Sequence, residues 1–294
     1  MNPQPLEAGE AGYSSVVEAL GLAGLSAEGR VQKLIETSPE IIASRISPGI
    51  MFSPLVDGHL IPSEPTFESI NANPPWAPTS CEAIMVGYSP LDASVFGMMG
   101  LFQRKKGIAA AFATFVRSFL ASHPQEAEKL LGLYGLGSGS TIDDDEAFIS
   151  ILRFATDIGY RAPAHTLAKT FAGQAYVLQF SEPNPWDGPF KGYTTHVLDV
   201  AFFFQNYNDH LSESQKATAV KLASDIFQFV HGNAPWDDFR KSEQVVVYQN
   251  GGRTGNNSQA LTTEEYQGVL KVGDVVGLDT LANAVVAFVF APPA

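Results

Sequence analysis

The most constraining feature of the sequence is an apolar run that leads into a Pro- and Gly-rich loop and then into an aromatic run. Residues 174–180 read Gln-Ala-Tyr-Val-Leu-Gln-Phe, which predicts a strand. The loop that follows carries His196, and residues 197–204 turn back into a Phe-rich segment. Because loops at strand ends carry much of the chemistry of open α/β sheets, this arrangement predicts an α/β fold with His196 as a candidate functional residue.

Two further apolar runs predict strands, at residues 83–87 and 244–248. Residues 83–87 form a continuous apolar run, as expected for a strand that is covered on both faces. Residues 269–289 are expected to add short strands or a tail. Apolar periodicity and capping residues predict helices at residues 13–20, 27–37, from 38, 93–102, 109–120, 125–133, from 143, 163–172 and from 212.

The composition indicates one compact α/β domain over residues 1–294, with a small central sheet and several packed helices. A chain of 294 residues with 45% hydrophobic content can bury a sizeable core without dividing into two domains. Its 31 acidic and 18 basic residues give a net charge of -13. This charge argues against nucleic-acid partners and anionic membrane surfaces, because both require clustered Lys and Arg.

The cysteine content, the apolar segments and the acidic runs of the sequence bear on its compartment and cofactors. Cys81 is the single cysteine, so an intramolecular disulfide is excluded and a reducing compartment is favoured. The first residues do not resemble a signal peptide, and the most apolar segment, 284–291, is too short to span a bilayer, so we expect a cytoplasmic protein. The acidic run 143–146 lacks the ligand alternation of a calcium loop. We therefore expect neither metal nor cofactor.

Asp92 is the second candidate functional residue, because it follows directly after the strand at 83–87. A carboxylate beside an imidazole fixes the tautomer of the imidazole, which then acts as a base near neutral pH. Two alternatives stay open. Asp92 would instead cap a helix at 93–102, and His196 would be a hydrogen-bonded loop residue without a catalytic role.

Three segments resemble a known family. They are Pro-Leu-Val-Asp-Gly-His-Leu-Ile-Pro at 54–62, Ile-Met-Val-Gly-Tyr-Ser-Pro-Leu-Asp-Ala-Ser-Val-Phe at 84–96, and the loop at 180–205 that contains His196. Together they resemble the type-B carboxylesterases, the cholinesterase-like branch of the α/β-hydrolase superfamily, and specifically the fungal members. The resemblance runs from about residue 6 to about residue 236 and corresponds to the second half of a family chain. It implies a truncated α/β-hydrolase-like fold in which Asp92, where the family usually has Glu, and His196 are the acid and base of a catalytic triad.

The nucleophile of that triad is missing from the sequence. The family places its serine in a Gly-x-Ser-x-Gly elbow, and this pentapeptide does not occur here. The nearest candidates, at residues 12–14, 87–89 and 135–139, fail the spacing. By comparison with the family, the chain would be either a natural truncation or an incomplete gene product.

Three functions are compatible with these features. The favoured one is a non-hydrolytic enzyme derived from a carboxylesterase, of the cyclase, pericyclase or lyase type, that acts on a small apolar metabolite in fungal secondary metabolism; it would bind its substrate in a reactive conformation. The second is an ester hydrolase that is active only with a missing N-terminal half. The third is a non-catalytic protein that binds a small molecule. The candidate substrate-binding residues are Phe96, Phe112, Phe115, Trp186 and Phe203.

The resemblance also implies an oligomer. In the family the strand at 83–87 pairs with the nucleophile strand, which this sequence lacks, so its outer edge would be bare. Bare edges of apolar strands are an association hazard that proteins cover or pair. We therefore expect a homodimer in which the partner covers that edge. The alternative is that residues 269–289 fold back and supply the missing strand.

Overall fold

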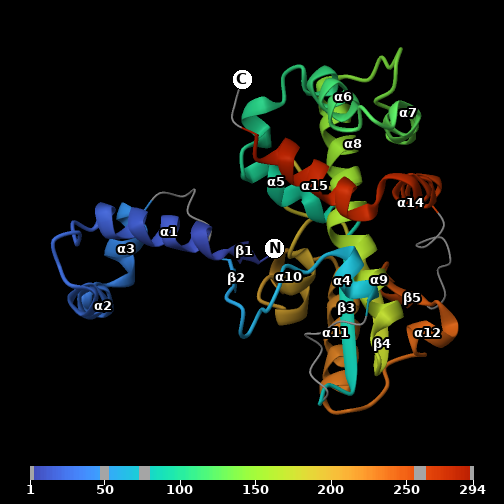
Figure 1. The fold of residues 1–294 in the computed structure, drawn as a ribbon. Coiled ribbons are helices and arrows are strands. Elements are labelled where there is room, and N and C mark those ends of the chain that lie inside the picture. Colours follow the sequence, from blue (N-terminus) through green and yellow to red (C-terminus); the bar gives the residue numbers. More distant parts are fainter. Residues whose placement is uncertain (1–2, 47–52, 73–79, 255–262, 292–294) are drawn as a thin grey trace. The chain divides into compact units, whose positions relative to one another are not determined.

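The computed structural model describes residues 3–46, 53–72, 80–254 and 263–291 (Figure 1). The chain forms two compact units, Met1–Thr66 and Phe67–Ala294, where its length and composition indicate a single domain. Each unit is described by itself.

The first unit is built from short amphipathic helices. α1 (Leu6–Ala19), α2 (Ala27–Glu36) and α3 (Pro39–Arg45) follow one another, and β1 (Gln4–Pro5) pairs in parallel with β2 (Leu55–Val56). Ser26 caps α2 by accepting a 3.2 Å hydrogen bond from the amide of Gly29. After β2, Asp57 closes the turn because its Oδ1 accepts from the amides of residues 59, 60 and 61 at 2.9, 2.9 and 3.0 Å.

The second unit contains a four-stranded sheet. β3 (Ala83–Tyr88), β4 (Gln174–Phe180) and β5 (Val245–Gln249) run parallel, and β6 (Gly252–Thr254) is antiparallel to β5, in the order β3-β4-β5-β6. The three apolar runs in the sequence are therefore strands, as predicted. Within the described residues no strand pairs with the outer edge of β3.

Helices cover both faces of this sheet. Ala175 and Val177 of β4 pack on one face with α9 (Ala162–Thr170) and α12 (Phe239–Ser242). Leu178 and Phe180 point to the other face, where they meet α10 (Leu198–Phe204) and α11 (Glu213–Val230). This alternation follows from the period-2 geometry of a strand, and two covered faces explain why β4 is apolar along most of its length.

The remaining helices form the larger hydrophobic core of the second unit. The core joins α6 (Ile108–Phe119), α7 (Pro124–Leu133) and α8 (Asp144–Thr156) to the C-terminal helices α14 (Glu264–Val276) and α15 (Leu278–Val289). The shorter elements are α4 (Phe67–Asn71), η1 (Asp92–Ser94), α5 (Val95–Met98), η2 (Leu101–Arg104), η3 (Asp157–Arg161) and η4 (Asn208–His210). The helix predicted at 93–102 is thus broken into short turns, with Gly100 in a positive-φ conformation of 126°.

The expectation of short strands or a tail at 269–289 is wrong. These residues lie in α14 (Glu264–Val276) and α15 (Leu278–Val289). The buried residues of α15 are Leu281, Ala284, Val285, Phe288 and Val289, which is helical spacing. No extra strand comes from this segment, so it does not cover the edge of β3.

Among the described helices, none alone has the length and apolarity of a membrane span. Taken together, α14 and α15 pass the same length and composition test, with a bend of 105° between them.

Candidate acid-base site

Asp92 is held at the carboxyl end of β3. Its Oδ2 accepts a 2.6 Å hydrogen bond from the amide of Ser89, and its side chain is buried. The next residue, Ala93, donates its amide to Oγ1 of Thr156 at 3.0 Å, which fixes the turn against the end of α8. The carboxylate therefore accepts from an amide upstream of it, in a buried turn, and does not act as the simple helix cap that the sequence left open.

His196 is brought to Asp92 by backbone contacts between the two loops. Leu91 forms a parallel bridge with Thr195, and the amide of His196 donates to Oγ of Ser94 at 3.1 Å. Nδ1 of His196 then lies 3.2 Å from Oδ1 of Asp92. The Asp92 side chain is 9% exposed and that of His196 is 35% exposed, so the pair has a buried acid and an accessible base.

This geometry defines what the imidazole can do. Both oxygens of Asp92 are occupied, one by the Ser89 amide and one by His196. The carboxylate favours the tautomer with the proton on Nδ1, which leaves Nε2 free to accept a proton. Among the described residues Nε2 makes no hydrogen bond. The pair can therefore act as a general base toward a group that approaches Nε2.

Aromatic and acidic neighbours surround the pair. The ring of Tyr160 stands edge-on to His196, with 5.5 Å between ring centres, and the ring of Phe96 lies 6.4 Å from that of Tyr160. Burial, together with the negative charge of Asp92, raises the pKa of Tyr160 well above its usual value. Burial and the charge of Asp92 also raise the pKa of Asp199. Both shifts reflect the burial of these two side chains beside the pair.

The residue after His196 has an unusual backbone conformation. Val197 lies in the left-handed region with φ 56° and ψ 12°, immediately before α10. This region is rare for β-branched residues, and such a conformation costs about 1–3 kcal/mol. The conformation turns the chain from the His196 loop into the aromatic helix.

The five aromatic residues that are candidates for substrate binding lie in two different hydrophobic clusters. Phe112 is buried in the helical core against Phe154 and Phe288, and Phe96 and Phe115 pack on the same core. Trp186 and Phe203 belong to the cluster under α10 and α11 on the sheet. Four cavities among the described residues are lined by other side chains, and neither His196 nor Asp92 lines any of these four.

The sequence did not single out the residues that orient the pair. Four residues contact Asp92, His196 or the turn that carries Asp92; they are Ser89, Ser94, Thr156 and Tyr160. Tyr160 lies on η3, a π-helical turn between α8 and α9, and such turns are frequent at functional sites. No pattern in the sequence predicts this π-helical turn. Within the described ranges, no group of three or more His, Cys, Asp or Glu side chains is arranged to hold a metal ion.

The fold is α/β-hydrolase-like, and its parallel strands place an acid after β3 and a histidine after β4 at hydrogen-bond distance. Solved structures share it. Aspergillus niger EstA matches with a TM-score of 0.55 and 12% identity, over 94% of this chain and 57% of that one. Juvenile hormone esterase from Manduca sexta matches with a TM-score of 0.55 and 14% identity, over 92% and 57%. A PNB esterase matches with a TM-score of 0.52 and 16% identity, over 91% and 55%.

The likeness to these esterases concerns the fold, because the identities are low. The chain spans somewhat over half the length of each of them. No protein-family model matches the sequence, and no curated protein matches it.

Proposed function

We propose that the chain carries the acid-base part of an ester hydrolase and that the serine comes from a separate polypeptide segment. The observation that carries this proposal is the 3.2 Å contact between His196 Nδ1 and Asp92 Oδ1, with Nε2 left accessible. In the proposed reaction, Nε2 takes the proton of a serine hydroxyl while the serine oxygen attacks the ester carbonyl. The same proton then goes to the departing alcohol, and water releases the acid in a second cycle.

Three features support this function over the non-hydrolytic one favoured by the sequence. A nucleophile-free cyclase needs an enclosed apolar cavity at its base, whereas the aromatic residues expected to form it are distributed over two clusters. The structural relatives are esterases in which this chain's fold occupies just over half of the molecule. The third feature is the buried Asp92 carboxylate. It accepts hydrogen bonds from the Ser89 amide and from Nδ1 of His196, and it thereby orients His196 for proton transfer.

The test supplies the serine. The purified chain is mixed with a polypeptide segment that contains a Gly-x-Ser-x-Gly elbow, and hydrolysis of p-nitrophenyl butyrate and labelling by a fluorophosphonate probe are measured. We expect labelling of the added serine only when the chain is present. His196→Ala should lower both readouts at least about 100-fold, the scale of a lost general base. His210→Ala, at an exposed histidine of η4, is the matched control.

Three results would contradict the proposal. They are robust hydrolysis by the chain alone that depends on one of its own serines, labelling that is unchanged in His196→Ala, and the absence of any labelling in the mixture.

The second candidate is the non-hydrolytic enzyme, favoured by the aromatic rings of Tyr160 and Phe96 beside an accessible base. Here Nε2 of His196 removes a proton from carbon and returns it to another atom of the same apolar molecule, so the reaction needs no redox partner. Acetophenone in D2O tests it, because exchange of its methyl protons reports proton abstraction by NMR. This candidate requires exchange by the chain alone that is lost in His196→Ala.

A further inference from the structure

The longest helix in the described part of the chain is α11, with 18 residues, and only one of its sides is buried. The side chains on that side include Ala219 and Leu222, which pack on the sheet. The buried residues of the helix are Gln215, Thr218, Ala219, Leu222, Ala223 and Asp225. At 3.6 residues per turn these positions occupy one side of the helix, so the opposite side points away from the sheet.

A regular stripe of exposed residues runs along that opposite side and ends at the C-terminal cap. The stripe consists of Glu213, Ala217, Val220, Ser224, Phe227 and His231. Its intervals alternate between four and three residues, which is the spacing of a helix seam that packs against another helix. Val220 and Phe227 are each 55% exposed, although both are large apolar side chains.

The order of side-chain sizes along the stripe is complementary to itself. Counted from Leu222, Ala217 and Phe227 lie five positions before and after, and Val220 and Ser224 lie two positions before and after. When two copies of the helix pack antiparallel about a two-fold axis at Leu222, residues at equal distances from the axis face each other. Phe227 then meets Ala217 of the second copy, and Val220 meets Ser224. Each large side chain therefore faces a small one, as knobs-into-holes packing requires.

The charges at the ends and flanks of the stripe are compatible with this pairing. Glu213 and His231 lie at its two ends, at equal distances from the centre, so a carboxylate faces an imidazole at each end. The two lysines beside the stripe are neutralised within their own helix. Lys216 pairs with Glu213 and Lys221 pairs with Asp225, both at 2.8 Å. Uncompensated like charges therefore do not meet along the seam.

We infer that α11 packs against α11 of a second copy of the chain, antiparallel and about a two-fold axis, through Ala217, Val220, Ser224 and Phe227. A two-fold contact uses the same surface twice, so that surface has to be complementary to itself. A different protein would require no such relation between the two halves of the stripe. The pairing of Phe with Ala and of Val with Ser therefore favours a second copy as the occupant.

The stripe is separate from the acid-base site and from the edge of β3. It contains neither Asp92 nor His196, so the inference does not depend on the proposed function. α11 contacts β5 and β6, whereas β3 is at the other end of the sheet order. Substitutions in the stripe should therefore leave both the catalytic pair and any pairing at β3 unchanged.

The experiment exchanges the large residue and the small one. Sedimentation equilibrium from micromolar to millimolar concentration measures self-association of the unmodified protein, of Ala217→Phe, of Phe227→Ala and of the double variant. Phe227→Ala should weaken association at least about tenfold, because each copy loses a buried ring. Ala217→Phe should weaken it as well, because two rings then compete for one space. The double variant again places Phe opposite Ala, and its affinity should return to within about threefold of the unmodified value.

Controls separate this interface from general effects. Phe119→Ala removes an exposed ring from α6 and should leave association unchanged. Ala217 and Phe227 are exposed in the single chain, so each variant should keep its thermal midpoint. Amide exchange at residues 213–230 should slow as concentration rises.

Four results would overturn the inference. They are a chain that stays monomeric throughout, which would assign the stripe to another partner; association that Phe227→Ala leaves unchanged; a double variant that associates no more tightly than Ala217→Phe; and amide exchange in α11 that is independent of concentration.

Discussion

The amide of Ser89 donates to Oδ2 of Asp92 at 2.6 Å, and this one contact leaves Oδ1 as the oxygen that faces His196. The orientation of the Asp92 carboxylate is therefore set by a contact within its own loop, independently of His196. A carboxylate that is oriented in this way presents a single acceptor to Nδ1 of the imidazole.

Asp92→Asn should disrupt this arrangement, because an amide has only one acceptor oxygen for the two donors, the Ser89 amide and Nδ1–H. We expect a loss of about 1–3 kcal/mol in the free energy of unfolding, the cost of an unsatisfied buried donor. The low-field proton resonance of His196 Nδ1–H should also disappear from the NMR spectrum. Asp209→Asn, at an exposed site on η4, is the control. Persistence of the resonance in Asp92→Asn would count against the pair.

Thr156→Val should destabilise the turn that carries Asp92. The Thr156 side chain is buried, accepts the Ala93 amide at 3.0 Å and donates to the carbonyl of Leu152 at 2.8 Å. Valine has the same shape but leaves the amide unsatisfied, so we expect a loss of about 1–3 kcal/mol by urea denaturation. Thr156→Ser keeps the hydroxyl and should lose less. Equal stability of the valine and serine variants would rule out a role for this hydrogen bond.

Asp225→Asn should be among the most damaging carboxylate-to-amide changes, because this carboxylate is 1% exposed and serves three donors. It accepts from the Tyr248 hydroxyl at 2.8 Å, from Arg253 at 3.0 Å and from Lys221 at 2.8 Å. Removing one partner of a buried ion pair costs about 3–5 kcal/mol. Asp187→Asn breaks an exposed pair with Lys191 and should have little effect. Comparable thermal midpoints of the two variants would contradict this reading.

His165 should make the protein less stable in acid. Burial lowers the pKa of His165 to about 3, with smaller contributions from the charges of Arg161 and Lys169. Its ring contacts Tyr88, Phe239 and Tyr266 and accepts or donates one hydrogen bond to the Tyr266 hydroxyl at 2.9 Å. The pKa in the unfolded chain is about 6.5, so only the unfolded state binds a proton between these values.

The sign follows from proton linkage. The contribution of His165 is fully present above about pH 6.5 and is lost as the pH falls toward 3, by up to about 1.4 kcal/mol for each pH unit. His165→Gln should therefore flatten the acid limb of stability against pH, measured by urea denaturation between pH 7 and 4. Asp157, whose pKa is raised by burial, is present in both proteins and cancels in the comparison. Parallel acid limbs would refute the assignment.

We propose that the outer edge of β3 pairs with a second copy of the chain. β3 is apolar, lies at the end of the sheet, and in the described part of the chain has no strand partner on that side. Unpaired backbone groups on such an edge accept another strand, and two-fold association is the commonest outcome. Light scattering at micromolar concentration should report a dimer, with hydrogen exchange at residues 83–88 that slows as concentration rises. A strict monomer with fast exchange at β3 would exclude this pairing.

The strands could be predicted from sequence because a buried parallel strand is a short continuous apolar run. Residues 83–87, 174–180 and 244–248 all have this character, and all three are strands. Residues 269–289 have the same richness in Val and Ala, yet they form α14 and α15. Their helical spacing was hidden by the overall apolarity, and burial against α6 and α7 decided the outcome.

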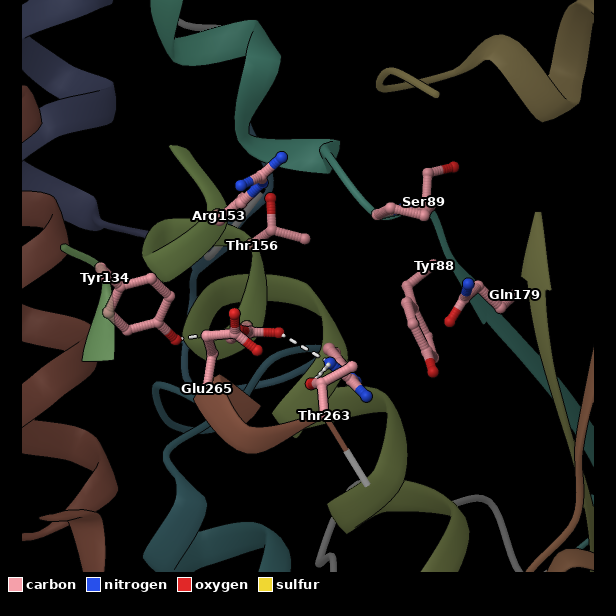
Figure 2. A pocket seen from close by; sticks show the side chains of 11 residues that line it. Tyr88, Ser89, Tyr134, Arg153, Thr156, Gln179, Thr263 and Glu265 are labelled. Atoms are coloured by element: carbon pink, nitrogen blue, oxygen red, sulfur yellow. Dashed lines mark hydrogen bonds and ion pairs between the residues drawn. The ribbon is translucent and has the colours of Figure 1, made fainter. Parts of the chain in front are cut away.

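The site was predictable in part. The proximity of His196 and Asp92 followed from a family resemblance and from strand topology, since both follow parallel neighbouring strands. The distribution of the aromatic candidates over two clusters was not predictable, because a Phe stripe such as that of α6 has the same sequence pattern in a core as in a cavity wall. The pocket lined by Tyr88, Thr156 and Glu265 among others (Figure 2) has no local sequence signature, because its residues come from segments between 88 and 265 and meet only in the folded chain.

The left-handed conformation of Val197 bears on how this chain would respond to selection for thermal stability alone. Glycine adopts φ 56° without steric cost, and the Val197 side chain is 57% exposed, so its replacement sacrifices little packing. Stabilising substitutions of this kind are easy to find and are often costly to function. Valine at this position restricts the backbone next to His196 to a narrow range, and glycine would widen it. Valine at position 197 therefore keeps the backbone next to His196 rigid at a cost in stability, whereas glycine would relieve the strain and leave the imidazole less firmly oriented.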